Sequence, residues 1–258
     1  MFRMLKNAVR PHLQSPWLHK AHAYLHRLAA LPDHPSESPE ATDLEQFFNA
    51  RTEGPGIWKW RHYFDTYDRY LRPFRGQAVH FMEIGVYSGG SLDMWQSYFG
   101  DACQILGVDI EAACRQYERP GVSILIGDQS DRQFWREALK DRPPFHAVLD
   151  DGGHQPHQQV PTFEEVFPHL APGGIYICED VHHSGNGFFT YMSALADQLN
   201  AGRISRTPSG SALPTSPAAK WIRAIHFYPF MVVVERNQRP VDRLVSEKHG
   251  TQWQPFLK

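Results

Sequence analysis

Cysteine is scarce in this 258-residue sequence. Cys103, Cys114 and Cys178 are odd in number, and no two of them show CxxC spacing. This pattern does not indicate a disulfide framework and is typical of ordinary thiols in a reducing compartment. We therefore expect a cytoplasmic protein.

Long apolar runs are also missing. No stretch reaches the roughly 18 apolar residues that a membrane-spanning helix needs. The first 28 residues lack both an uninterrupted apolar core and a small-residue cleavage site, so they do not resemble a signal peptide. The apolar fraction of 41% is still sufficient for a proper core.

Neither sign of charge is in strong excess. The sequence has 26 basic and 28 acidic residues and a formal net charge of −2. Such a balance provides no general attraction to nucleic acid. We therefore expect a small-molecule partner, no nucleic acid and no membrane span, and we expect the chain to form a homo-oligomer.

Composition divides the chain into three parts. We predict an N-terminal helical segment and Pro/Ser-rich linker over residues 1–43, a main domain over residues 44–240 and a C-terminal tail over residues 241–258. The stretch 205–220 is rich in Ser, Pro and Thr. We predict that it forms a mobile loop.

The main domain predicts an α/β fold. Short apolar runs alternate with stretches long enough for helices, which favours a Rossmann-like, doubly wound, mostly parallel sheet. Residues 221–236 form two further strand-like runs around Tyr228-Pro229 and predict a C-terminal antiparallel hairpin, for seven strands in all. The five earlier runs are residues 78–86, 104–110, 122–128, 145–151 and 174–180.

The dinucleotide fingerprint G-x-G-x-x-G is absent, and the first strand ends instead in the stretch EIGVYSGGS. Gly85 and Gly89 allow a tight turn, and the helix from Ser91 offers free N–H groups to an anion. This spacing fits a cofactor that has a carboxylate and no pyrophosphate.

Acidic and amide residues follow the next two strands. Asp109 is placed to hold two ribose hydroxyls, and Asp128 with Gln129 could recognise an adenine edge. Each of these features alone is often structural, since an acid at a strand end commonly caps a helix. Their shared order and spacing favour S-adenosylmethionine.

Three more acids follow the fourth and fifth strands, whose exits open at the same edge of the sheet. Asp151, Glu179 and Asp180 would repel one another in a dry pocket unless they were protonated or bound a cation, most simply Mg²⁺. Such an ion could hold two adjacent substrate hydroxyls, with His154 within reach as the general base. In the alternative interpretation Asp150 and Asp151 only cap the following helix.

These motifs resemble the class I S-adenosylmethionine-dependent methyltransferases, and more narrowly the metal-dependent sugar O-methyltransferases of macrolide biosynthesis (the mycinamicin and tylosin type). The similarity covers about residues 57–236. Its motifs are KWRHYF, EIGVYSGGSLDMW, GVDI, IGDQSD, DDGGH, FPHLAPGGIYICED and IHFY.

The resemblance implies an S-adenosylmethionine- and Mg²⁺-dependent O-methyltransferase acting on a hydroxyl of a sugar, a glycosylated natural product or a glycan. It implies His154 as general base and Asp151, Glu179 and Asp180 as Mg²⁺ ligands. The stretch VHHSGNG after Asp180 departs from the Thr-Ser-Tyr run common in the family, so the acceptor could differ. The expected cofactor-binding residues are Glu83, Gly85, Tyr87, Ser91, Asp109, Asp128, Gln129 and Asp150.

Other functions are less well supported. The cephalosporin hydroxylase-like group is the nearest rival, but no histidine here is followed two residues later by Asp or Glu, as iron(II) oxygenases often require. The stretch GVYSG is G-x-x-S-G and lacks the hydrolase spacing G-x-S-x-G. A non-catalytic S-adenosylmethionine-binding protein would have no need of the acids and His154.

Overall fold

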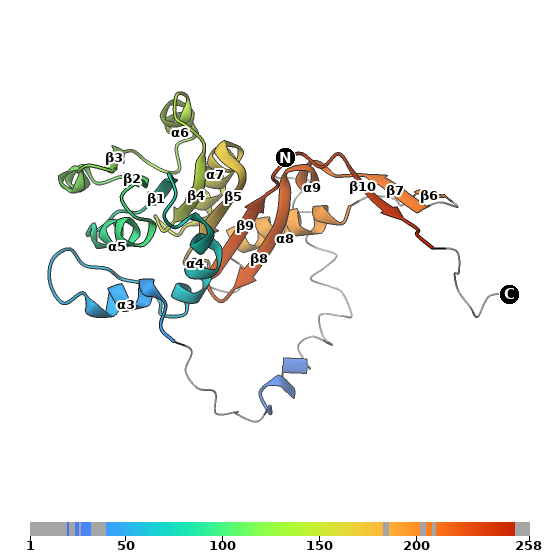
Figure 1. Ribbon diagram of the computed structural model, residues 1–258, viewed down its shortest axis with the longest axis horizontal. Coiled ribbons are helices and arrows are strands. Elements are labelled where there is room, and N and C mark those ends of the chain that lie inside the picture. The colour runs from blue at the N-terminus through green and yellow to red at the C-terminus, as the bar shows by residue number, and fades with distance from the viewer. Residues whose placement is uncertain are drawn as a thin grey trace.

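The computed structural model describes residues 20, 24–25, 27–31, 40–182, 186–201, 205–207 and 210–250. Of the predicted N-terminal helical segment, only residues 20, 24–25 and 27–31 fall within these ranges. Figure 1 shows a central sheet flanked by helices, with a smaller group of strands extending from it. The predicted α/β class is confirmed.

The central sheet has seven strands in the order β3-β2-β1-β4-β5-β9-β8. The first five are parallel, whereas β9 runs antiparallel to both β5 and β8. The predicted mostly parallel sheet with a C-terminal hairpin is therefore confirmed. The strands are β1 (His80–Ile84), β2 (Gln104–Asp109), β3 (Val122–Ile126), β4 (Phe145–Asp150), β5 (Leu170–Cys178), β8 (Ile222–Tyr228) and β9 (Met231–Arg236).

Helices cover both faces of this sheet. Successive side chains of a strand point to opposite faces, and here the side chains on both faces are largely apolar. Phe81 packs in one buried cluster with Trp95, and the adjacent Met82 packs in a second cluster with Trp135. Among the described residues, no helix has both the length and the apolar character needed to cross a bilayer. The helices are α3 (Asp43–Ala50), α4 (Tyr63–Leu71), α5 (Gly90–Phe99), α6 (Arg132–Leu139), α7 (Pro156–Val166), α8 (Gly187–Leu199) and α9 (Pro217–Trp221).

The strand register brings the ends of the parallel strands to one edge. Ile84 at the end of β1 is paired with Asp150 of β4, and Asp150 is paired with Cys178 of β5. Strands β1 and β4 are neighbours although they are not consecutive, so the strand order reverses between them. The edge beyond the carboxyl ends of the strands at such a reversal is where open α/β sheets bind ligands.

A second sheet corrects the prediction of a mobile loop over residues 205–220. The stretch 205–220, predicted as a loop, contains β6 (Ser205–Thr207), β7 (Gly210–Pro214) and the start of α9. The predicted tail contains β10 (Arg243–Glu247), which pairs antiparallel with β7. The prediction of a loop was wrong because the partner of β7 lies about thirty residues further along the chain. Local composition carries no information on such a pairing.

Glu83 is an acid in the middle of the sheet with no solvent exposure. Its carboxylate accepts hydrogen bonds from Ser91 Oγ and Trp95 Nε1, both at 2.8 Å, and so fastens β1 to α5. Burial raises the pKa of Glu83 to about 7, against the opposing effects of the Lys59 ammonium and these two hydrogen bonds. Between pH 4.5 and about 7, this pKa keeps a proton on Glu83 in the folded protein that the unfolded chain releases.

This difference predicts a pH dependence of stability. Between the ordinary pKa of 4.5 and about 7, the folded state binds more protons, so the contribution of Glu83 to stability falls as pH rises. Glu83→Gln removes this contribution. The free energy of unfolding of the variant minus that of the wild type should increase by about 3 kcal/mol between pH 4.5 and 7.5. Urea unfolding across this range measures it, and a difference independent of pH would contradict the proton on Glu83.

Candidate active site

A cavity of about 760 Å³ opens at the carboxyl ends of the parallel strands. This volume lies within the range of small-molecule sites. Its wall includes residues that follow each of the five parallel strands. Of the predicted site residues, Gly85, Tyr87, Asp109, Asp128, Gln129, Asp151, His154, Glu179 and Asp180 line it.

Gly85 forms the floor of the turn after β1. Its φ is +89°, and a Cβ at this position would lie 2.0 Å from the backbone oxygen of Asp151. Asp109 ties the same turn from the side, because its Oδ2 accepts hydrogen bonds from the N–H groups of Val86 (2.8 Å) and Tyr87 (2.9 Å). The turn is thus held open and close to the loop that carries Asp151.

Gln129 spans the space between the turns after β3 and β4. Its Oε1 accepts from the N–H of Gly153 at 2.6 Å, and its Nε2 donates to Asp150 at 3.0 Å and to Thr162 at 3.2 Å. Both amide hydrogens are therefore engaged within the protein. Of the two residues expected to recognise adenine, Asp128 is therefore the better placed, because it lines the cavity and the amide of Gln129 is already engaged.

Three predicted cofactor residues lie behind the wall. Glu83, Ser91 and Asp150 are buried and do not line the cavity. Asp150 accepts from Tyr176 and Gln129, and burial raises its pKa. Their direct contact with a cofactor stays an untested prediction, and the geometry gives them a supporting position.

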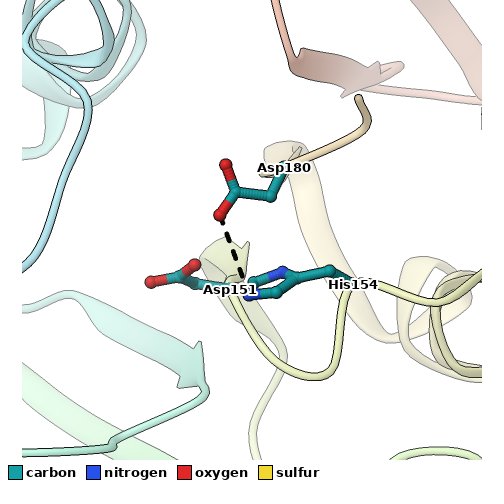
Figure 2. A group of neighbouring side chains, drawn as sticks. All are labelled: Asp151, His154 and Asp180. Carbon is teal, nitrogen blue, oxygen red and sulfur yellow. Dashed lines mark ion pairs between the residues drawn. The ribbon is translucent and has the colours of Figure 1, made fainter. Parts of the chain in front are cut away.

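Asp151, His154 and Asp180 converge at the mouth of the cavity (Figure 2). One side-chain ligand atom from each lies within 4.8 Å of the others. His154 Nε2 is 3.7 Å from Asp180 Oδ2, while its buried Nδ1 has no hydrogen-bond partner. The loop after β4 and the exit of β5 thus present two carboxylates and one imidazole to the same point.

Glu179 is not part of this group. It is buried, both of its oxygens accept from Lys59 Nζ at 3.1–3.2 Å, and Oε1 also accepts from the hydroxyl of Tyr67. The structure therefore brings together two of the three predicted metal ligands and turns the third toward Lys59. The predicted set of three stays a prediction.

The segment before α4 and the first residue of α4 supply partners for all three acids. Lys59 Nζ lies 2.5 Å from Asp151 Oδ2. Trp60 Nε1 and the hydroxyl of Tyr63 donate to Asp180 Oδ1 at 3.0 Å and 2.9 Å. The other oxygen of Asp180, Oδ2, is the one nearest His154.

We did not predict these partners, although they lie in or near the KWRHYF motif. A signal was present for two residues of this region, since Tyr63 and Tyr67 are four residues apart, the spacing of one helix face, whereas Lys59 precedes the helix. What the spacing could not show was which strand ends this face contacts.

The electrostatics of the cluster follow from burial. Burial alone would lower the pKa of Lys59, but the carboxylates of Asp151 and Glu179 outweigh it and raise the pKa, so the ammonium stays charged. Burial and the acids also raise the pKa values of Tyr63 and Tyr67, which keeps both hydroxyls protonated as donors. One ammonium therefore pairs with two of the three carboxyl groups, and the third, that of Asp180, accepts from Trp60 and Tyr63.

Backbone strain is concentrated around the cavity. Among the described residues, the non-glycine residues with positive φ are Tyr87 (49°), His154 (57°), Asp180 (52°) and Phe230 (61°). The first three line the cavity, and the ring of Phe230 packs on Trp60 at 5.6 Å. Such conformations persist where the surrounding structure fixes them, often at functional sites.

The donor set fits a hard divalent cation, because Asp151 and Asp180 supply oxygen atoms at one point and face only one ammonium. The cavity also fits a nucleoside-type cofactor. Its volume of about 760 Å³ is sufficient for such a molecule, and Gly85 and Gly152 let the turns after β1 and β4 pack tightly against Asp151 and Gln129 at its wall.

A family model described as a methyltransferase domain matches residues 82–181. This stretch of the chain, which runs from β1 to the exit of β5, is therefore similar to a methyltransferase domain. Its homologues are sugar O-methyltransferases of natural products. One is the 8-demethyl-8-α-L-rhamnosyl tetracenomycin-C 2′-O-methyltransferase of Streptomyces olivaceus, 32% identical over 73% of this chain and 53% of the relative. Another is the mycinamicin VI 2″-O-methyltransferase of Micromonospora griseorubida, 35% identical over 57% of this chain and 37% of the relative.

A solved structure agrees. The MycE methyltransferase of the mycinamycin pathway, in complex with Mg, SAH and mycinamycin VI, superposes with a TM-score of 0.62 and 26% identity, covering 78% of this chain and 54% of that chain. The resemblance predicted from the motifs is confirmed. The chain spans about half the length of the first curated relatives, at 53% and 50%.

The Gly85 turn generates a test with a matched control. Gly85 and Gly100 share a φ of +89°, but a Cβ on Gly100 has no atom within 4 Å. Gly100→Ala should cost about 1–3 kcal/mol for its backbone conformation alone (φ 89°, ψ 177°), which is essentially restricted to glycine. Gly85→Ala should cost about 2 kcal/mol more from the collision with Asp151, and should abolish S-adenosylhomocysteine binding. Urea unfolding measures the loss of stability in each variant, and calorimetry measures S-adenosylhomocysteine binding. Equal losses of stability in the two variants would show that Gly85 is not packed tightly against Asp151.

Proposed function

We propose that this chain is an S-adenosylmethionine- and Mg²⁺-dependent O-methyltransferase that acts on a hydroxyl of a sugar or glycosylated natural product. The observation that carries the proposal is the convergence of Asp151, Asp180 and His154 beside the glycine turn at one cavity. The tetracenomycin and mycinamicin relatives, named for methylating sugar hydroxyls, support the substrate class.

The glycine turn and Asp109 form the proposed cofactor side of the cavity. Asp109 holds the turn through Val86 and Tyr87, and it lies on the cavity wall. We propose that its carboxylate also accepts from the ribose hydroxyls and that Asp128 contacts the adenine edge. S-adenosylmethionine supplies the methyl group.

Asp151 and Asp180, with Glu179, are the proposed metal ligands. A divalent ion held there would bind two adjacent hydroxyls of the sugar and make one more acidic. Trp60 and Tyr63 fix Asp180 through Oδ1, which leaves Oδ2 directed toward His154. The acids therefore orient the acceptor next to the imidazole.

His154 is the proposed general base. With its proton on Nδ1, Nε2 is an acceptor on the side of Asp180. When Nε2 takes the proton of the sugar hydroxyl, the carboxylate of Asp180 lies 3.7 Å away and stabilises the imidazolium. With S-adenosylmethionine bound, the deprotonated sugar oxygen would take the methyl group as its bond to sulfur breaks, which would leave S-adenosylhomocysteine.

Exposed rings surround the mouth of the cavity and suit a glycoside acceptor. Trp58 is 85% exposed, Tyr87 is 74% exposed and Trp60 is half-exposed, and all three line the cavity. Aromatic faces of this kind supply large apolar contact area with a polar edge. We further propose a cytoplasmic location, which the three buried, unpaired cysteines support. We also propose that the chain forms a homo-oligomer.

Metal removal tests the reaction class. With labelled S-adenosylmethionine and a panel of glycosides, we expect methyl transfer in Mg²⁺ and none in EDTA. Calorimetry should show S-adenosylhomocysteine binding at micromolar Kd or tighter, about −8 kcal/mol, and nearly the same in EDTA, because the metal contacts the acceptor and not the nucleoside. Full activity in EDTA would mean that the acids are structural.

His154→Ala tests the base. Turnover should fall by about 10²–10⁴-fold, while the affinities for Mg²⁺ and S-adenosylhomocysteine should stay within about twofold of wild type, because neither depends on the imidazole. His157→Ala is the matched control, since His157 is exposed, three residues further on, and should keep wild-type turnover. Loss of Mg²⁺ binding in His154→Ala would make His154 a ligand instead.

A further inference from the structure

Lys59 is a buried cation inside the acid cluster. Its side chain is only 2% exposed. The ammonium lies 2.5 Å from Asp151 Oδ2 and 3.1 Å and 3.2 Å from the two oxygens of Glu179. It thus joins the exit of β4 to the exit of β5 at their carboxyl ends.

The position of Lys59 accounts for the geometry of the acids. Glu179 uses both oxygens on Lys59, and one of them also accepts from Tyr67. For that reason Asp151 and Asp180 share a common point with His154, and Glu179 does not. A divalent ion bound to Glu179 would need an oxygen that the ammonium now contacts, and on Asp151 the ammonium already contacts Oδ2.

Charge leads to the same conclusion. The ammonium pairs with Asp151 and Glu179, and Asp180 lies beside His154, so one ammonium accompanies three carboxyl groups and the cluster still attracts positive charge. A divalent ion and an ammonium packed against the same two carboxylates would repel each other strongly in a buried site. Simultaneous occupation by both is therefore unfavourable.

We propose that Lys59 takes the position of the divalent ion between Asp151 and Glu179 and that the ion binds by displacing it. This inference rests on the proposed metal role of the acids. Lys59 is followed directly by Trp60, which donates to Asp180 and lines the cavity. Displacement of Lys59 couples metal binding to the segment that borders the acceptor side of the cavity.

Mg²⁺ titration of the full chain tests the inference by calorimetry, without an activity assay. Lys59→Met keeps the length and apolar stem but removes the charge, and it should bind Mg²⁺ at least about tenfold more tightly than wild type. Lys59→Arg keeps the charge and should bind no more tightly than wild type. Equal or weaker binding in Lys59→Met would overturn the inference. Tighter binding shows that the ammonium opposes the ion, and the acetylation measurement below separates a displaced lysine from one that stays in place.

A second measurement uses the wild-type protein, so it does not depend on the folding of a variant. Amine acetylation followed by peptide mass spectrometry should show Lys59 protected without Mg²⁺ and several-fold more reactive with it. Protection that persists at saturating Mg²⁺ would overturn the displacement while leaving the metal site intact. Absence of Mg²⁺ binding in both wild type and Lys59→Met would overturn the proposed function as well.

Discussion

Three carboxyl groups placed at the ends of two adjacent parallel strands are the constraint on which the rest of this structure depends. Asp151, Glu179 and Asp180 cannot share a buried edge without positive charge or protons. The segment before α4, together with the first residue of α4, supplies one ammonium from Lys59 and hydrogen-bond donors from Trp60 and Tyr63. The same contacts fix the wall of the cavity, so charge compensation and substrate access depend on one stretch of chain.

The parts of the fold and site that depend on local pattern could be predicted from the sequence. Apolar runs ending in Gly85, Asp109 and Asp151 identified the parallel strands, and the exits of parallel strands meet at one edge. That rule was sufficient to bring Asp151, His154 and Asp180 to one cavity. The pairing of β7 with β10 was missed, because it depends on contacts between distant segments of low β propensity.

The exact partners of the polar side chains could not be predicted. Gln129 was expected to recognise adenine, yet its amide joins the turns after β3 and β4. Glu83 was expected near the cofactor, yet it fastens β1 to α5 inside the core. No contact between Lys59 and the acids was expected, although this lysine lies between two tryptophans in the sequence. In each case the residue type was informative, but the choice of partner required the packed structure.

The central claim is that the acids after β4 and β5 form a metal-dependent methyl-transfer site beside the glycine turn. A crystal structure with Mn²⁺ and S-adenosylhomocysteine tests it most directly, because Mn²⁺ substitutes for Mg²⁺ at oxygen sites and is located by anomalous scattering. We predict an anomalous peak within coordination distance of Asp151 and Asp180, with the nucleoside beside Gly85 and Asp109. A peak away from both acids, or a nucleoside outside the cavity, would contradict the account.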